Sequence, residues 1–209
     1  MKATKWKSYS LALIAGMSVL TACSSDDNND NGGNGNNGNG NEIENGTTLK
    51  GTITSDVTLT AGSTYKLSGE YIVEDGATLN IEAGVKIISI YDDIVDYILV
   101  KQGGKINAVG TSSAPIVMTS EKEEPGAWGG IHICGKAHTN AEGGKGSSEI
   151  GGATYGGNDD ADNSGKLQYV RVEYTGYAFD EEHEANGITF YGVGSGTIVD
   201  HCQAYKGSD

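Results

Sequence analysis

The segment that decides the fold is DGATLNIEAGVKI, at 75–87. Apolar and polar residues alternate along it, so Leu79 and Ile81 point to one side of a strand and Asn80 points to the other. Gly84 then ends the alternating run. This pattern predicts a short β-strand with one buried face.

Related segments lie before and after this strand. TLTAGSTYKL at 58–67 matches TLNIEAGVKI at 78–87 at an offset of 20 residues, and GGKIN at 103–107 follows GATLN at 76–80 by 27 residues. Both spacings are too short for an intervening helix. Further strand candidates, bounded by Gly, Asn or Asp, are PIVMTS (115–120), WGGIHI (128–133), LQYVRVEY (167–174), GITFYG (187–192) and TIVDHCQAY (197–205).

A period of 20 to 30 residues made of strands and turns is typical of a solenoid. A β-sandwich, the alternative, has no reason to repeat T-L-x with a glycine turn at a fixed offset. In a parallel β-helix each coil stacks on the previous one, and its turns use glycine where φ is positive. With 33 glycines, two prolines and no helical periodicity, residues 48–209 are predicted to form an all-β parallel β-helix.

The first 22 residues have the features of an export signal. They begin with basic residues and continue into an apolar run that is too short to cross a bilayer. LTAC at 20–23 resembles the lipobox of bacterial lipoproteins, which implies cleavage before Cys23 and lipidation of that residue. The alternative is an ordinary signal peptide with a chance cysteine.

Residues 23–47 are predicted to be a disordered tether, because they consist mainly of Asn and Gly and cannot bury a core. The SSDDNND run after Cys23 resembles the acidic tract that directs Bacteroidota-type lipoproteins to the outer face of the outer membrane. Such a run also serves as a plain solvated tether. The expected location is therefore the outer membrane, with the lipid on Cys23 as the membrane contact and the domain facing the exterior.

The chain is strongly acidic, with a formal net charge of −14. Loss of the signal would remove three lysines and leave Arg171 as the sole arginine. Such a surface disfavours nucleic acid and polyanionic substrates. The remaining cysteines, Cys134 and Cys202, lie in strand-like segments, so two buried thiols are predicted, with a disulfide as the alternative in an exported protein.

The order of motifs carries a family resemblance. GATLNIEAGVKI, GGKINAVGTSSAPIVMTS, PGAWGGIHICGKA, LQYVRVEYTG and GITFYGVGSGTIVDHCQAY together resemble a family of Bacteroidota surface or secreted proteins with a right-handed, pectin-lyase-like β-helix, over roughly 49–209. The resemblance implies fold and surface location far more than activity. Chains of that family usually continue into further coils, so the sequence predicts a truncated product whose last coil is uncapped.

FDEEHE at 179–184 holds the candidate catalytic residues. Asp180 and Glu182 share a face if this segment is extended, and glycosidases use two carboxylates at a defined separation. The alternative is a solvated acidic loop. The pectate-lyase-like enzymes that the chain resembles need calcium and basic residues around a uronate, and a single arginine makes that activity a poor fit.

NDDADNSG at 158–165 holds the candidate metal ligands Asp159, Asp160 and Asp162. Calcium binds clustered oxygens, but the twelfth position of an EF-hand counted from Asp160 is Arg171, which excludes that motif. An irregular calcium site remains as one interpretation, and an Asp-rich turn without an ion is the other. No other cofactor is expected.

Aromatic residues are concentrated in the later coils. Trp128, Tyr174, Tyr177 and Tyr191 are predicted to stack on sugar rings if they are exposed on the solenoid. The alternative places Trp128 inside a coil corner and the tyrosines at core edges. The sequence thus predicts a surface lipoprotein that binds a glycan or a protein without catalysis, with a polysaccharide lyase or glycoside hydrolase, or a structural or adhesive stalk, as alternatives.

Overall fold

The computed structural model describes residues 41–180 and 183–208, which belong to one compact unit. The predicted signal segment, Cys23 and Glu182 lie outside this range. The described residues form short strands and a single 3₁₀ turn, η1 (Glu142–Gly144), and contain no α-helix. Within the same residues, no helix is long and apolar enough to cross a membrane.

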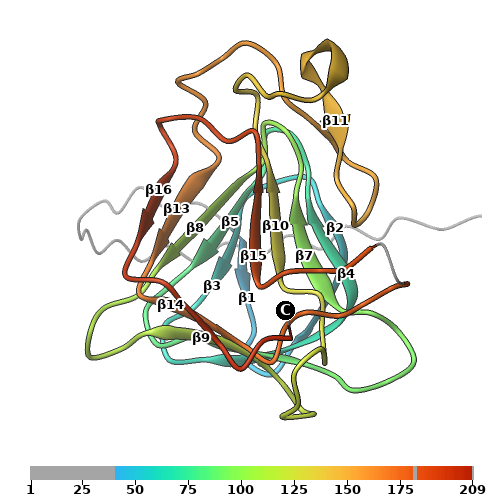
Figure 1. Ribbon diagram of the computed structural model, residues 1–209. Helices are drawn as coiled ribbons and strands as arrows, with labels where there is room; N and C mark the ends of the chain where they lie inside the picture. Colours follow the sequence, from blue (N-terminus) through green and yellow to red (C-terminus); the bar gives the residue numbers. More distant parts are fainter. Residues whose placement is uncertain (1–40, 181–182, 209) are drawn as a thin grey trace, which may run out of the picture. The chain divides into compact units, whose positions relative to one another are not determined.

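Parallel strands wind into coils with three faces, shown in Figure 1 along the axis of the coils. The first face is β1 (Asn41–Ile43), β3 (Val57–Leu59), β5 (Thr78–Ile81), β8 (Lys105–Val109), β13 (Gly165–Gln168) and β16 (Ile198–Asp200). The second consists of the first parts of β2 (Thr48–Ile53) and β4 (Thr64–Val73), then β6 (Lys86–Ser89), β9 (Ile116–Ser120), β14 (Val170–Glu173) and β17 (Gln203–Tyr205). The third consists of the later parts of β2 and β4, then β7 (Tyr97–Val100), β10 (Ile131–Cys134) and β15 (Ile188–Tyr191).

The corner between the second and third faces lies within β4. Its residues 64–67 pair with β6, and its residues 70–73 pair with β7. The left-handed φ of +69° at Gly69 lets the chain turn there without a loop. The described strands are therefore those of a parallel β-helix, as the sequence predicts.

The register of the coils corrects one spacing. Val57 and Leu59 pair with Leu79 and Ile81, an offset of 22 residues rather than 20. The two-residue difference keeps each side chain on the same face, because side chains along a strand alternate with period two. The 27-residue spacing is confirmed by the pairing of Leu79 with Ile106.

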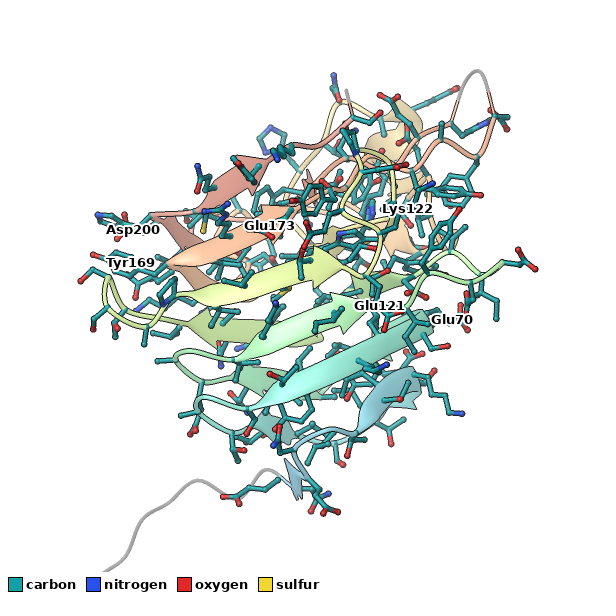
Figure 2. All side chains as sticks on the ribbon, turned by 90° about the horizontal axis from the view of Figure 1, so that it is seen from below. Glu70, Glu121, Lys122, Tyr169, Glu173 and Asp200 are labelled. Atoms are coloured by element: carbon teal, nitrogen blue, oxygen red, sulfur yellow. The ribbon has the colours of Figure 1, made fainter. Side chains whose placement is uncertain are left out.

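Inward-pointing residues stack into apolar ladders that form one continuous core. Leu59, Ile81, Ala108 and Leu167 follow one another on the first face, and all are buried. Burial of about 25 cal/mol per Å² of apolar surface makes such ladders the main source of stability. Figure 2 shows the outer side of the second face, with Glu121 and Lys122 at one end and Tyr169 and Asp200 at the other.

The first coil begins inside the segment assigned to the tether. β1 pairs with β3, Asn41 N donates to Asp56 O at 3.0 Å, and Ile43 packs against the core. Backbone pairing needs no apolar run, and this explains why an Asn-rich segment can join the sheet. The ordered solenoid therefore starts by Asn41, not at residue 48.

Long loops leave the coils at only a few places. The corner between the second and third faces takes only two residues within β4. In the next three coils the same corner is formed by longer loops, at 90–96, 121–130 and 174–187. A longer excursion, 135–164, follows β10 and carries an antiparallel hairpin of β11 (Gly146–Ser147) and β12 (Thr154–Tyr155) (Figure 1). Binding residues in proteins concentrate on such loops over a rigid scaffold.

Candidate binding site at the loop corner

The three stacked corner loops enclose a pocket of about 320 Å³, here called the corner site. It is lined by loop 90–96, by part of loop 121–130 and by Tyr177 of the third loop. The lining residues are Ile90, Tyr91, Asp92, Asp93, Ile94, Val95, Lys122, Gly126, Ala127 and Tyr177. The three loops belong to the successive coils that contain β7, β10 and β15, here called coils 3, 4 and 5, so the site exists only because these coils stack.

Apolar and aromatic side chains are unusually exposed around the corner site. Tyr91 and Ile94 have 59% and 60% of their surface accessible, and Phe179 has 43%. The ring of Phe179 meets that of Tyr177 edge to face, with 5.1 Å between centroids. Large exposed rings around a hollow are typical of binding surfaces rather than of ordinary solvated loops.

The charge of the corner site is predominantly negative. Asp92 Oδ1 accepts a hydrogen bond from Ile94 N at 2.8 Å, which shapes the loop, and Asp93 adds a second carboxylate. The cation Lys122 lies 4.5 Å from the centroid of the Tyr91 ring and pairs with Glu124 at 3.1 Å. The single lysine is thus already balanced, and the pocket offers little to a polyanion.

A buried carboxylate supports loop 90–96 from beneath. Asp96 is 1% exposed, and its carboxylate accepts hydrogen bonds from Gly69 N and from Ser89 Oγ, the latter at 2.7 Å. Burial raises the pKa of this carboxyl from 3.8 to about 6, although the two hydrogen bonds oppose the shift. Asp96 therefore fastens the corner loop of one coil to the corner of the coil before it.

The raised pKa of Asp96 predicts a pH-dependent stability. The folded protein holds this proton more tightly than the unfolded chain, so the stabilisation is complete below about pH 4 and is lost as pH rises through about 6. The Asp96→Asn variant keeps an acceptor for Gly69 N and a donor for Ser89. The free energy of unfolding of this variant should equal that of the parent at low pH. At pH 7 it should exceed that of the parent by up to about 3 kcal/mol.

Urea unfolding of parent and Asp96→Asn at pH 4 and pH 7 measures this effect. The difference between the two proteins isolates Asp96 from other groups, notably His132. Burial lowers the pKa of that histidine, so its contribution to stability is lost as pH falls below about 6.5. This dependence is opposite to that of Asp96, whose contribution is lost as pH rises. An equal pH dependence in both proteins would show that Asp96 does not titrate as described.

The described parts of the predicted catalytic segment, residues 179–180 and 183–184, lie side by side rather than in line. Ala178 bridges to Glu184 in antiparallel fashion, and Phe179 N donates to His183 O at 2.9 Å. Asp180 Oδ1 accepts from His183 N at 2.9 Å and lies 2.8 Å from His183 Nδ1. Asp180 and His183 are in contact, whereas on an extended strand residues three apart point to opposite sides. Glu182 lies outside the described residues.

The structure does not bring the three candidate calcium ligands together. Asp159 Oδ1 accepts from Ala161 N at 3.2 Å, Asp160 Oδ1 accepts from His138 N at 3.1 Å, and Asp162 Oδ2 accepts from Ser164 Oγ at 2.8 Å. Across residues 41–180 and 183–208, no group of three or more His, Cys, Asp or Glu residues is arranged to hold a metal ion. Asp159 and Asp162 instead accept hydrogen bonds within their own turns, and Asp160 contacts His138, 22 residues earlier in the chain.

Of the four predicted stacking residues, only Tyr177 lines the corner site. Trp128 is 1% exposed and Tyr174 is 7% exposed, so neither offers a free ring face. Trp128 instead packs inside the corner, where its indole N–H donates to Glu173 O at 2.7 Å. Tyr191 is half-buried beside Tyr155, 5.1 Å between centroids, under the excursion.

Sequence analysis missed Tyr91, Ile94 and Phe179. The available signal was the increase in strand spacing, from 22 residues between β3 and β5 to 27 between β5 and β8, since the extra residues form the loop that carries Tyr91. Both cysteines are free thiols, and the predicted burial is confirmed for Cys134, whereas Cys202 is only partly buried. Burial raises the pKa of the Cys134 thiol to about 11, which leaves it protonated and inert.

The parallel coils, inward ladders and corner loops define the class as a parallel β-helix protein. Residues 51–209 match the family described as pectate-lyase like beta helix domain, and the chain belongs to that family. No curated protein and no solved structure gives a significant match. Family membership therefore identifies the scaffold, and the activity must be argued from the site.

Proposed function

We propose that this protein binds a neutral polysaccharide at the corner site without cleaving it, and that a lipid on Cys23 holds it at the outer surface of the outer membrane. The observation that carries the binding proposal is the exposure of Tyr91 and Phe179 beside the pocket that Tyr177 lines. The location rests on the LTAC motif and the acidic run after it. Metabolic labelling with an alkyne fatty acid, abolished by Cys23→Ser, tests the anchor.

The chemistry of the corner site suits a sugar chain. Aromatic rings provide broad apolar faces for the C–H side of a sugar ring, and carboxylates such as Asp93 accept hydrogen bonds from hydroxyl groups. The volume of about 320 Å³ lies within the range of small-molecule sites, which combine apolar walls with a few polar groups. The net charge of −14 favours an uncharged ligand over a polyanion.

Binding is favoured over lyase chemistry by the position of the arginine. Arg171 lies on β14 of the second face, where its Nε pairs with Glu173 at 2.7 Å and its guanidinium stacks 4.1 Å from the Tyr205 centroid. It is not among the residues that line the corner site. A hydrolase using Asp180 and Glu182 remains the second candidate. The experiment below detects its activity as the release of chain ends.

A polysaccharide array with neutral and acidic glycans, scored for both binding and release of reducing or unsaturated ends, tests the proposal. We expect saturable binding of a neutral glycan without release. Tyr91→Ala and Tyr177→Ala should each weaken binding about tenfold or more, since truncating an anchoring aromatic residue typically costs over 1.4 kcal/mol. Tyr205→Ala, which removes a partly exposed ring from the second face, is the matched control.

Three outcomes would contradict the proposal. Release of chain ends that disappears in Asp180→Ala would establish the enzyme instead. Binding that survives loss of both Tyr91 and Tyr177 would place the ligand elsewhere. A folded sample that binds no glycan would favour the structural or adhesive stalk.

A further inference from the structure

Loop 90–96 forms one wall of the corner site and is attached to the coils at its two ends. The residues between these ends, 91–94, are exposed. At the first end, Ile90 N donates to Leu67 O at 2.9 Å. At the last end, the buried Asp96 forms hydrogen bonds with neighbouring coils, so the position of this wall depends on that residue.

Asp96 joins three successive coils. Its carboxylate accepts hydrogen bonds from Gly69 N in the corner of the preceding coil and from Ser89 Oγ of its own coil, the latter at 2.7 Å. Its backbone carbonyl accepts from Gly129 N of the next coil at 2.8 Å. Gly129 lies shortly after Ala127, which lines the corner site. Movement of Asp96 would therefore loosen two of the loops that form the pocket.

The charge of this carboxylate is not neutralised by a cation. Across residues 41–180 and 183–208, no ion pair includes Asp96. The one lysine on the loops around it, Lys122, pairs with Glu124 at 3.1 Å, and His132 turns its Nε2 to Gly129 O at 2.8 Å. The titratable groups on the elements packed around Asp96 are Glu70, Asp92, Asp93, Tyr97, Glu121, Lys122, Glu123, Glu124 and His132.

An unpaired buried carboxylate favours its protonated form. Burial raises the pKa of Asp96 to about 6, and the charge of Asp92 contributes in the same direction. If the loop lifts, water reaches the carboxylate and its pKa returns toward the ordinary value of 3.8. The seated loop thus holds the proton more tightly than the lifted loop. Ionisation above pH 6 shifts the balance toward the lifted loop by at most about 100-fold.

We infer that Asp96 is a pH-sensitive anchor of the corner site: a neutral Asp96 keeps loop 90–96 seated, and an ionised Asp96 favours a lifted loop that takes Tyr91 out of the pocket. The glycan then binds tightly at acidic pH and weakly at alkaline pH. This consequence for binding rests on the proposed function. The movement of the loop does not, because it depends on the coils alone, and the two are tested separately.

Amide hydrogen exchange of loop 90–96 measures the movement without a ligand. Protection is compared at pH 5 and pH 8 after correction for the intrinsic exchange rate at each pH. We expect the parent to lose about tenfold in protection at pH 8, within the limit set by the linkage. Asp96→Asn, which cannot ionise, should show the same protection at both pH values.

Ser89→Ala is a second variant, in which the titrating group is kept. The hydrogen bond from Ser89 Oγ lowers the pKa of Asp96, because it stabilises the ionised carboxylate. Without this bond, the midpoint of the change in protection should move to higher pH in a series from pH 4 to pH 9. A midpoint equal to that of the parent would mean that another group controls the loop.

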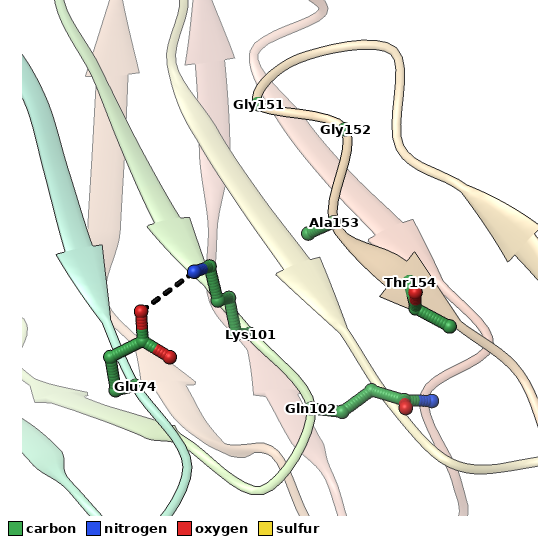
Figure 3. A pocket seen from close by; sticks show the side chains of 7 residues that line it. All are labelled: Glu74, Lys101, Gln102, Gly151, Gly152, Ala153 and Thr154. Carbon is green, nitrogen blue, oxygen red and sulfur yellow. Dashed lines mark hydrogen bonds and ion pairs between the residues drawn. The ribbon is translucent and has the colours of Figure 1, made fainter.

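The pocket at the other end of β7 supplies the matched control. This pocket of about 370 Å³ lies between the end of β7 and the β11–β12 hairpin, and Glu74 is the carboxylate in its wall (Figure 3). The Glu74 side chain is 33% exposed, and its Oε1 lies 2.6 Å from Lys101 Nζ. Glu74→Gln removes one negative charge without touching Asp96, so it should keep the pH response of the parent.

Calorimetric titration at pH 5 and pH 8 measures the consequence for binding. The probes are hexamers of β-1,4-linked glucose, mannose and xylose. For a hexamer that binds, we expect the affinity of the parent to fall about tenfold at pH 8, in parallel with the protection of the loop. Asp96→Asn should bind it equally at both pH values, and Tyr91→Ala should bind it weakly at both.

The outcomes separate the two claims. If the protection of the parent is equal at both pH values, or if Asp96→Asn keeps the pH dependence of the parent, the anchor is wrong whichever glycan binds. If protection changes as expected but no hexamer binds, or Tyr91→Ala binds as the parent does, the proposed function fails and the anchor stands. If a hexamer binds the parent equally at both pH values while protection changes, the loop does not control binding, and that consequence is overturned. Circular dichroism of each variant confirms that the fold is intact.

Discussion

Gly165→Ala is expected to lower the free energy of unfolding by about 3–5 kcal/mol, one of the two largest effects of a single substitution in this chain. Gly165 begins β13 with a φ of +118°, a conformation that side chains rarely adopt. A Cβ at this position would lie 2.1 Å from Ile106 O of the preceding coil. Neighbouring strands are about 4.8 Å apart and fixed by their ladder of hydrogen bonds, so the coil below cannot retreat.

Gly46→Ala separates packing from backbone strain. Gly46 also has a positive φ, +87°, but its Cβ would meet nothing within 4 Å. The expected loss in the free energy of unfolding is therefore only the cost of backbone strain, about 1 kcal/mol. Urea unfolding followed by circular dichroism measures both variants, and an equal loss in the two would show that the contact with Ile106 is not the cause.

The fold could be predicted because its main determinant is local. Inward and outward residues alternate along each strand, as at Leu79, Asn80 and Ile81, and the turns end at glycines such as Gly84. The exact register of strand pairing was harder to predict from the sequence. Pairing Thr58 with Thr78 instead of Asn80 keeps the same residues buried, so the apolar pattern cannot distinguish offsets of 20 and 22.

The corner site could not be predicted in the same way. Tyr91, Lys122 and Tyr177 come from three loops that become neighbours only when the coils stack in register. The sequence shows that residues are inserted between strands, but it does not show at which of the three corners they emerge. Positions on loops that are remote in sequence depend on that choice, and this is why Tyr91 was missed.

The burial of Trp128 was undecided in the sequence for a related reason. An aromatic residue beside two glycines suits either an exposed platform or a corner plug. The decisive fact is tertiary, because Trp128 pairs with Thr175 of the next coil and its indole N–H reaches Glu173 O. The hydrogen bond is available only after coils 4 and 5 have stacked.

Trp128→Ala is the second substitution with a large expected effect, a loss of about 3–5 kcal/mol in the free energy of unfolding. Trp128 is among the largest fully buried side chains, so its removal leaves a cavity at the corner. The same change leaves the Glu173 carbonyl without its donor. Urea unfolding of the parent and the variant gives the loss directly.

Trp128→Phe distinguishes these two contributions, because phenylalanine keeps most of the apolar contact and lacks the indole N–H. We expect it to cost about 1–2 kcal/mol, clearly less than the alanine variant. Trp128 directly follows Gly126 and Ala127 of the corner site, so the alanine variant should also weaken glycan binding under conditions where it remains folded. Unchanged stability in Trp128→Ala would mean that the corner loops are held without this side chain, and the account of how they are positioned would then be wrong.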